Sequence, residues 1–130
     1  MHYNHTAHGL LVDDIDRAVR FYRDKLGYRV DRQSETFAQM DNGGPVVLFF
    51  WQWAHLEKHL GKEAMAQVKH RVQSAIRFEH PEEVDEAYKE LRTKGVHFLA
   101  APNDWEWNAR AAYFVDDDGY MWELFCWSKP

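Results

Sequence analysis

One carboxylate stands in an otherwise apolar run near the end of the chain, and it is the residue best placed to do chemistry. Glu123 lies between Trp122 and Leu124, with Met121 and Phe125 two residues away on either side. Burial of an unpaired carboxylate is costly. Glu123 therefore either faces water or faces a site, where it could contact a ligand, pair with an arginine or bind a metal.

Histidines and the single cysteine are the other candidates for chemistry. His55 and His59 are four residues apart and could share a helix face as a metal pair does. Their segment is charged, however, so the sequence favours a solvated helix. His5 is interpreted as a surface histidine at a strand end rather than a ligand. Cys126 is the only cysteine, which excludes an intrachain disulfide and favours a buried, inert thiol.

Bulk composition bounds the classes of protein that need to be considered. The chain has 130 residues, a formal charge of −5, a pI of about 5.9 and an aromatic content of 15%. One domain spanning residues 1–130 is expected. The acidic balance argues against nucleic-acid binding, and no apolar run approaches the roughly 20 residues of a membrane helix. No signal peptide is visible, so a cytoplasmic location is expected.

The elements that would position Glu123 follow from periodicity and turn residues. Asp118-Gly119 predicts the tight turn of a closing hairpin over residues 113–125, with Glu123 on its second strand. Residues 54–69 are predicted to form a linker with one or two short helices, and residues 101–108 an irregular loop. The remaining predicted strands are at about 5–12, 28–33, 36–40, 46–51, 74–79 and 96–100, and the helices are at about 15–25 and 82–94.

The first half of the chain recurs in the second half. Residues 14–18 (DIDRA) match residues 83–87 (EVDEA) at an offset of 69 residues, and a glycine ends each predicted helix. Each half reads as strand, helix and three strands, over about 5–53 and 72–128, joined by a linker at about 54–71. A repeat defines a fold more firmly than any single element. We therefore predict an α+β fold of paired βαβββ modules, with a curled, cup-shaped mixed sheet and helices on its outer face.

With these motifs the chain resembles the vicinal oxygen chelate superfamily of glyoxalases, extradiol dioxygenases and bleomycin-resistance proteins. The resemblance rests on the pattern V-x-D-I-D-x-A-x-x-F-Y-x-x-x-L-G over residues 12–27, on the repeat of its core, and on D-D-D-G-Y-x-W-E over residues 116–123. It implies a small-molecule ligand in a cup-shaped cavity and a homodimer.

The resemblance also implies where a metal would be bound in the metal-dependent members. Their four ligand positions fall here at Ala7, at about Leu48, at about Ala75 and at Glu123. Three of these residues are apolar, and one carboxylate cannot hold a dication. The sequence therefore predicts neither a metal nor another cofactor.

Side-chain alternation then predicts the lining of the cavity. If Glu123 faces the cavity, Met121 and Phe125 share its face, and the same alternation predicts the lining residues of the fourth and fifth strands. The tryptophans are predicted to stack on a ligand, with a dimer interface as the alternative; a salt bridge from Glu123 to Arg77 or Arg110 is also left open. The predicted ligand-binding residues are Leu48, Phe50, Trp51, Arg77, Trp105, Trp107, Arg110, Met121, Glu123 and Phe125.

The sequence thus favours a metal-free binding protein for a planar aromatic or cationic ligand, such as an antibiotic that it would sequester. The alternative is a metal-dependent lyase, isomerase or dioxygenase of the same superfamily. A catalytic residue is not assigned.

Overall fold

A computed structural model describes residues 3–128, and its elements form two successive βαβββ units. The first unit contains β1 (Ala7–Val12), α1 (Ile15–Leu26), β2 (Arg29–Gln33), β3 (Phe37–Asp41) and β4 (Val47–Gln52). Two short helices follow, α2 (Trp53–Leu60) and α3 (Lys62–Met65). The second unit contains β5 (Val72–Arg77), α4 (Pro81–Thr93), β6 (His97–Trp105), β7 (Ala109–Val115) and β8 (Met121–Trp127). The predicted α+β fold of paired modules is confirmed.

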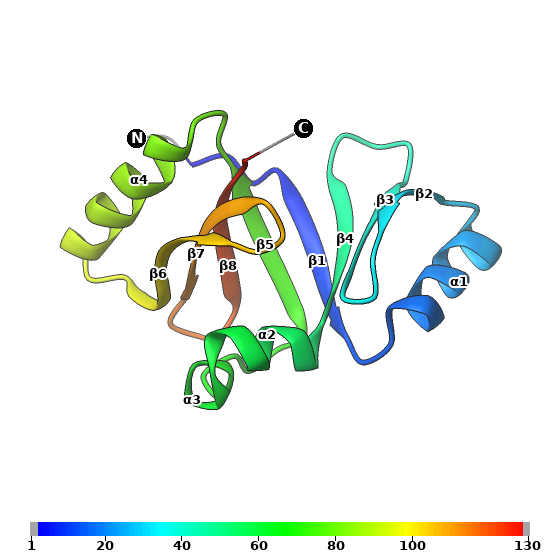
Figure 1. Ribbon diagram of the computed structural model, residues 1–130, viewed down its shortest axis with the longest axis horizontal. Coiled ribbons are helices and arrows are strands. Elements are labelled where there is room, and N and C mark those ends of the chain that lie inside the picture. The colour runs from blue at the N-terminus through cyan, green and yellow to red at the C-terminus, as the bar shows by residue number, and fades with distance from the viewer. Residues whose placement is uncertain (1–2, 129–130) are drawn as a thin grey trace.

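All eight strands belong to one curled sheet that does not close. Its order is β2-β3-β4-β1-β5-β8-β7-β6. The two units meet where β1 pairs antiparallel with β5, and each of these central strands also pairs in parallel with the last strand of its own unit. Figure 1 shows α1 and α4 at opposite ends of the molecule, outside the sheet.

Local sequence signals set the ends of both large helices. Asp14 caps α1 by accepting a hydrogen bond from the backbone N–H of Arg17 (3.1 Å), and Gly27 ends it with a φ of 74°. In α4, the side chain of Glu83 accepts a hydrogen bond from the N–H of His80, and Pro81 occupies the first turn. Among residues 3–128, no helix combines the length and apolar character that a membrane span requires.

Three hydrophobic cores divide the two faces of the sheet. One core lies between α1 and the strands of the first unit and includes Ile15, Val19 and Phe50. A second lies between α4 and the second unit and includes Val84 and Leu124. The largest lies on the concave face, where strands of both units pack with α2 and α3. The outer helices thus leave the concave face free to form a site.

The strand β6 is longer than the sequence predicted. Residues 101–105, expected to be an irregular loop, continue β6 past Pro102 as far as Trp105. Proline lacks the N–H that a central strand needs. It is tolerated here because β6 is an edge strand, and its register with β7 shifts on both sides of Ala100.

The closing hairpin turns at residues 116–120 and fixes the register of its strands. The carboxylate of Asp116 accepts hydrogen bonds from the N–H groups of Asp118 and Tyr120, both at 3.0 Å. Gly119 has a φ of 82°, a conformation that L side chains rarely adopt. This turn places Tyr113 on β7 directly opposite Glu123 on β8.

Candidate functional site

A single row of residues crosses five strands on the concave face. Val47, Ala7, Ala75, Glu123 and Tyr113 are successive register partners on β4, β1, β5, β8 and β7. Residues of one such row project to the same face of the sheet. Both units therefore contribute to the surroundings of Glu123.

Glu123 is bonded to a tyrosine rather than to an arginine. The hydroxyl of Tyr113 donates to Oε2 of Glu123 at 2.5 Å, and both side chains are buried. The second oxygen, Oε1, makes no hydrogen bond within residues 3–128. Burial raises the pKa of Glu123 to about 7, although the bond from Tyr113 acts in the opposite direction. Burial, and then the adjacent carboxylate, raise the pKa of Tyr113 well above its usual value.

Glu123 lies in the wall of a cavity of about 300 Å³, which we call the cup. The volume is at the small end of the range for ligand sites. Most of the lining is aromatic or aliphatic, and Arg77 and Glu123 are its ionisable side chains. The lining residues are Thr6, Ala7, Phe37, Gln39, Pro45, Val47, Phe49, Arg77, Trp107, Ala109, Glu123, Phe125 and Trp127.

A second hollow of about 190 Å³, the side pocket, adjoins the cup. The two share Phe37, Trp107 and Trp127 as wall residues. Trp51 and Arg32 also line the side pocket, and the guanidinium of Arg32 lies 4.8 Å from the ring centroid of Trp127. The side pocket is therefore bounded by three indole rings, two of which also line the cup.

The floor of the cup depends on the absence of a side chain at Gly9. A Cβ atom at this position would collide with the ring of Phe49, which lies over the Gly9 backbone. Gly9 is thus required for close approach of the ring, not for an unusual backbone conformation. Phe49 is buried and stacks on Phe37 with ring centroids 6.1 Å apart.

The helix α2 closes one side of the concave face through a cluster of rings. His55 stacks on Trp51, with centroids 5.5 Å apart and planes 4° apart, and it also contacts Trp107. His59 bonds the carbonyl of His55 through Nδ1 and the carboxylate of Glu106 through Nε2 (2.8 Å). The expectation of a solvated helix was wrong, because both histidines pack against Trp107, which lies about 50 residues further along the chain.

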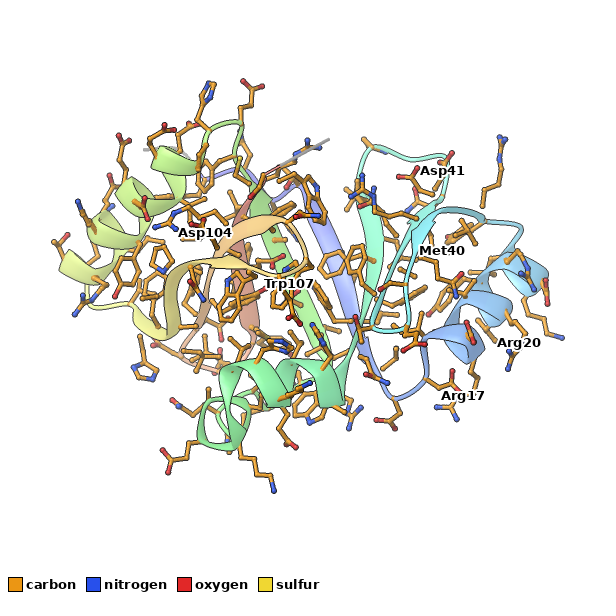
Figure 2. All side chains as sticks on the ribbon, in the orientation of Figure 1. Arg17, Arg20, Met40, Asp41, Asp104 and Trp107 are labelled. Atoms are coloured by element: carbon orange, nitrogen blue, oxygen red, sulfur yellow. The ribbon has the colours of Figure 1, made fainter. Side chains whose placement is uncertain are left out.

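His55 and Trp107 each leave a buried ring nitrogen unpaired. Nε2 of His55 and Nε1 of Trp107 have no hydrogen-bond partner within residues 3–128. Burial, followed by the nearby His59, lowers the pKa of His55. Trp107 lies near the centre of the molecule in the turn between β6 and β7, and it lines both hollows (Figure 2).

Leu48 and Phe50 do not line the cup, contrary to the prediction. Both pack against α1 on the convex face, while Val47 and Phe49 face the cup. Residues 46–51 are apolar at every position, so alternation offers no contrast there. A register error of one residue reverses every side chain. For the same reason, the second of the four metal-ligand positions implied by the resemblance falls at Val47 and not at Leu48.

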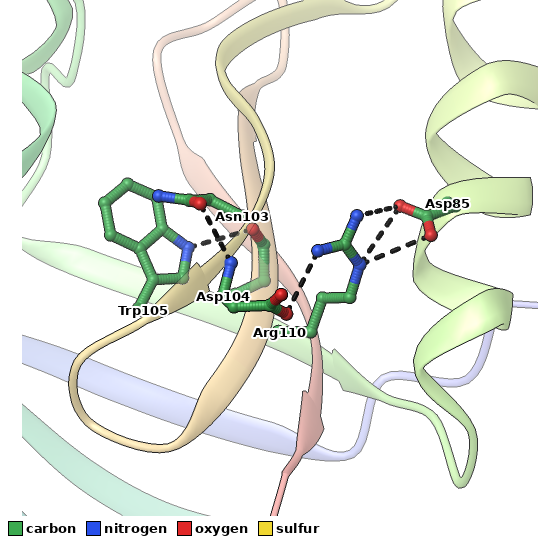
Figure 3. Close-up of polar contacts among 6 residues, drawn as sticks. Asp85, Asn103, Asp104, Trp105 and Arg110 are labelled. Atoms are coloured by element: carbon green, nitrogen blue, oxygen red, sulfur yellow. Dashed lines mark hydrogen bonds and ion pairs between the residues drawn. The ribbon is translucent and has the colours of Figure 1, made fainter.

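Arg110 also faces away from the cup, and the predicted alternative of a bond to Glu123 is wrong. Its guanidinium bonds Asp85 on α4 at 2.8 Å and Asp104 on β6 at 3.0 Å (Figure 3). These hydrogen bonds raise the pKa of Arg110. Ala109 and Ala111, on either side of Arg110, face the concave side. Arg110 therefore ties α4 to the sheet.

The remaining predicted ligand residues lie at different depths. Arg77, Trp107, Glu123 and Phe125 line the cup, and Trp51 lines the side pocket. Trp105 lies behind Trp107, with stacked rings 5.1 Å apart, and donates its N–H to the carbonyl of Ala111. Met121 is fully buried below the cup, where its sulfur accepts from the buried Gln73.

Several lining residues were not among the predicted ligand-binding set. The aromatic ones are Phe37, Phe49 and Trp127. Tyr113, the partner of Glu123, was also not predicted, although the closing hairpin contains the signal. A turn centred on Asp118 places residues whose numbers sum to 236 opposite each other, as Tyr113 and Glu123 are.

The residues of the row do not fit a metal ion. Glu123 is the one oxygen ligand among the four positions, because Val47, Ala7 and Ala75 offer no donor. Within residues 3–128, no three histidine, cysteine or acidic side chains are grouped so that they could hold a metal. A dication needs several such ligands.

Comparisons with known proteins agree with this fold. The family model described as Glyoxalase/Bleomycin resistance protein/Dioxygenase superfamily matches residues 2–124. The uncharacterized protein YraH of Bacillus subtilis (strain 168) is 32% identical over 123 residues, which are 89% of this chain and 92% of that protein.

Two solved structures share the fold at low sequence identity. One, described as an NAD-dependent benzaldehyde dehydrogenase from Legionella pneumophila, is 19% identical with a TM-score of 0.78, covering 93% of this chain and 97% of its own. The other is methylmalonyl-CoA epimerase of Streptomyces coelicolor, 21% identical with a TM-score of 0.69, covering 98% and 99%. On the family match and the identity to YraH, this chain belongs to the glyoxalase/bleomycin resistance protein/dioxygenase superfamily.

Proposed function

We propose that this protein binds a planar, mainly apolar small molecule in the cup, without a metal. The observation that carries the proposal is an aromatic cavity of about 300 Å³ with one carboxyl group in its wall. Such a combination of an apolar lining and few polar groups is typical of ligand sites. Sequestration of a planar antibiotic, as the resemblance to bleomycin-resistance proteins implies, is one form of this function.

The arrangement of rings supports a flat ligand. Phe37, Trp107 and Trp127 separate the cup from the side pocket, so a fused ring system could contact them from either hollow. Offset or edge-on contacts between aromatic rings are favourable beyond the area that they bury. Oε1 of Glu123 offers the ligand one hydrogen-bonding position at the end of this space.

Fluorescence titration with a panel of planar aromatics, including planar antibiotics, tests the proposal. Trp107 and Trp127 line the cup, so a bound ring is expected to quench their emission. The Trp107→Phe variant should lose part of the quenching. Trp122→Phe is the matched control, because Trp122 packs on the α4 side of the sheet. A folded protein whose emission and melting temperature no compound changes would contradict the proposal.

A second candidate function is metal-independent proton transfer by Glu123. The pKa of about 7 makes this residue an effective acid and base at neutral pH. Tyr113 fixes one carboxylate oxygen and leaves the other free. In this function Glu123 would take a proton from a weakly acidic C–H group of the ligand and return it to the resulting carbanion.

Hydrogen exchange separates the two functions. Compounds that bind would be incubated with the protein in D₂O, and their C–H signals followed by proton NMR. Exchange that Glu123→Gln abolishes, while binding persists, supports proton transfer. Binding without exchange in any compound supports the binding function alone.

The homodimer implied by the resemblance stays a prediction. Sedimentation velocity would show a species of twice the 15.5 kDa chain mass if it is correct. A single species at the chain mass across micromolar concentrations would contradict it.

A further inference from the structure

The charges around the cup and the side pocket point to an aromatic anion. We propose that the ligand is a planar aromatic acid whose carboxylate lies at Arg77 and whose ring extends toward Trp127. This inference rests on the proposed function and replaces the cationic ligand that the sequence suggested.

Arg77 is a cation in the wall of the cup that forms no salt bridge with another described residue, and it also borders an outer hollow that Glu79 and Glu83 line. Its side chain makes no hydrogen bond or ion pair with another residue of 3–128, Glu79 included. Its backbone is held by Thr6, whose hydroxyl oxygen accepts from the Arg77 N–H at 2.9 Å. An arginine presents several donors in a planar fork that matches a carboxylate. Arg77 is thus anchored by its backbone while its charge stays available.

A second arginine adds to the positive potential. Arg32 lines the side pocket and lies over Trp127, and it makes no ion pair within residues 3–128. The nearby carboxylate of Asp31 accepts a hydrogen bond from the side chain of Gln39 at 2.7 Å. The two hollows together contain two guanidinium groups and one carboxyl group, although the chain as a whole has a formal charge of −5.

The one acid in the cup is not permanently charged. Glu123 is bonded to the phenol of Tyr113 from β7, and the cup that it lines is also bordered by Arg77 from β5 and by the neutral Ala7 and Gln39 from β1 and β3. Burial brings its pKa to about 7. Below this pH the cup carries the positive charge of Arg77 with no opposing carboxylate.

The register of β5 and β8 places Arg77 and Glu123 at different depths in the cup. Ala75 is the partner of Glu123, and Arg77 lies two residues further along β5, opposite Phe125. Two residues of a strand span about 6.7 Å. A ligand carboxylate can therefore bind Arg77 while the ring fills the apolar space, and it avoids direct contact with Glu123.

An isosteric series tests the charge directly. We would measure binding of 2-naphthoate, 2-naphthamide and 2-naphthamidine, which carry an anionic, a neutral and a cationic group of similar shape, by calorimetry at pH 5.5 and 9. At pH 5.5 the naphthoate is expected to bind at least tenfold tighter than the other two. Ionised Glu123 should weaken it roughly tenfold at pH 9, because like charges a few ångströms apart repel strongly in a protein.

Variants identify the groups responsible. Arg77→Gln should weaken naphthoate at least tenfold and naphthamide less than twofold, and Arg32→Gln should weaken naphthoate two- to fivefold. Arg20→Gln, on the exposed face of α1, is the matched control and should change nothing. Glu123→Gln should remove the difference between the two pH values. In wild type, calorimetry in two buffers at pH 8 should detect proton uptake on naphthoate binding.

Each other outcome overturns the inference in a distinct way. Preference for the amidine would restore a cationic ligand, and equal binding of all three would show that charge does not select the ligand; both leave the proposed binding function in place. Failure of all three compounds to bind the folded protein would overturn the aromatic-acid proposal. If the wider panel of planar aromatics also fails, the proposed function fails with it.

Discussion

The carboxyl group of Glu123 is buried at a cost that depends on pH. Its pKa is about 7 in the folded protein and near 4.5 when exposed, a difference that corresponds to about 3 kcal/mol. Because burial raises the pKa of Glu123 in the folded state, the stability of the fold that depends on this group is fully present below about pH 4.5, where the carboxyl group is protonated in both states. It is lost as the pH rises to about 7, where the charged form must be desolvated.

Replacement of this group by a neutral one should remove the pH dependence. Glu123→Gln keeps an oxygen that can accept from Tyr113. We expect it to be more stable than wild type by up to about 3 kcal/mol at pH 8 and nearly equal at pH 4.5. Urea denaturation at both pH values measures this, with Glu79→Gln, an exposed acid two residues past the end of β5, as the control. The same change in stability at both pH values would contradict the buried, titrating carboxyl group.

The critical contact at Gly9 is between the aromatic ring of Phe49 and the backbone of Gly9, which has no side chain. Gly9→Ala should displace Phe49 and destabilise the fold by about 1–3 kcal/mol, as overpacking commonly does. Combined with Phe49→Leu, the same change should cost much less, because the colliding ring is gone. Gly44→Ala is the control, since a Cβ there meets only the side chain of Asn42. Additive losses in the urea denaturation of the double variant would exclude the proposed contact.

The helix α2 shows what sequence reasoning missed at the scale of elements. Its charged residues predicted a solvated linker, yet His55 and His59 pack on Trp51 and Trp107. Hydrophobic periodicity within one helix cannot reveal a partner that arrives 50 residues later. The paired units, the capped helices and the acidic turn were predictable, because each depends on local residues or on the internal repeat.

The sequence predicted only part of the candidate site. Its predictions agree with the structure on strands where polar and apolar residues alternate clearly, and they fail where that contrast is missing. On β8 the single charge at Glu123 defined the concave face, so Phe125 was placed correctly. On β4 every position from Val47 to Trp51 is apolar, and the assignment of Leu48 and Phe50 was reversed. At Arg110 the error came from treating the preceding residues as a loop, although β6 continues to Trp105.

His55 should make the packing of α2 sensitive to acid. Its pKa is lowered by burial, so stability is present above about pH 6.5 and is lost as the pH falls. His55→Phe keeps the stacking on Trp51 and removes the unpaired nitrogen. We expect the variant to gain more stability at pH 5 than at pH 8, measured by urea denaturation. His70→Phe, at an exposed histidine, is the control, and an equal effect of both variants would contradict the prediction.

The bonds of Arg110 tie α4 to β7 and β6, so their loss should affect stability and not binding. Arg110→Gln should cost about 1–2 kcal/mol, since the half-buried Asp85 loses its partner. Ligand affinity should stay within twofold of wild type. Arg77→Gln is the matched opposite, with weaker binding and unchanged stability. If Arg110→Gln weakens binding as Arg77→Gln does, Arg110 belongs to the site after all.

At the scale of the whole molecule, the two units meet in one row of residues around Glu123. Val47 and Ala7 come from the first unit, and Ala75 and Glu123 from the second. Four of the five residues in the row stand at the metal-ligand positions of the superfamily, on four neighbouring strands, and the side chains of three of them lack a donor atom. What separates this cup from a metal site is therefore side-chain chemistry and not backbone geometry.

Histidines at two of these positions should create a metal site. Ala7 and Ala75 are register partners on the central strands, so Ala7→His with Ala75→His would place two imidazoles beside the Glu123 carboxylate. Three such ligands suffice for a zinc ion with an open position. We expect the double variant to bind Zn²⁺ stoichiometrically by metal analysis and calorimetry, and to melt at a higher temperature when zinc is present.

Wild-type protein and the double variant that also carries Glu123→Gln are the matched controls. The first offers one of the three ligands, so zinc should not change its melting temperature. The second should bind zinc at least tenfold more weakly than the double variant, because it lacks the anionic ligand. Zinc binding by wild type at this site would contradict the conclusion that the apolar residues of the row exclude a metal. Failure of a folded double variant to bind would contradict the shared row itself, since the three side chains would then not converge.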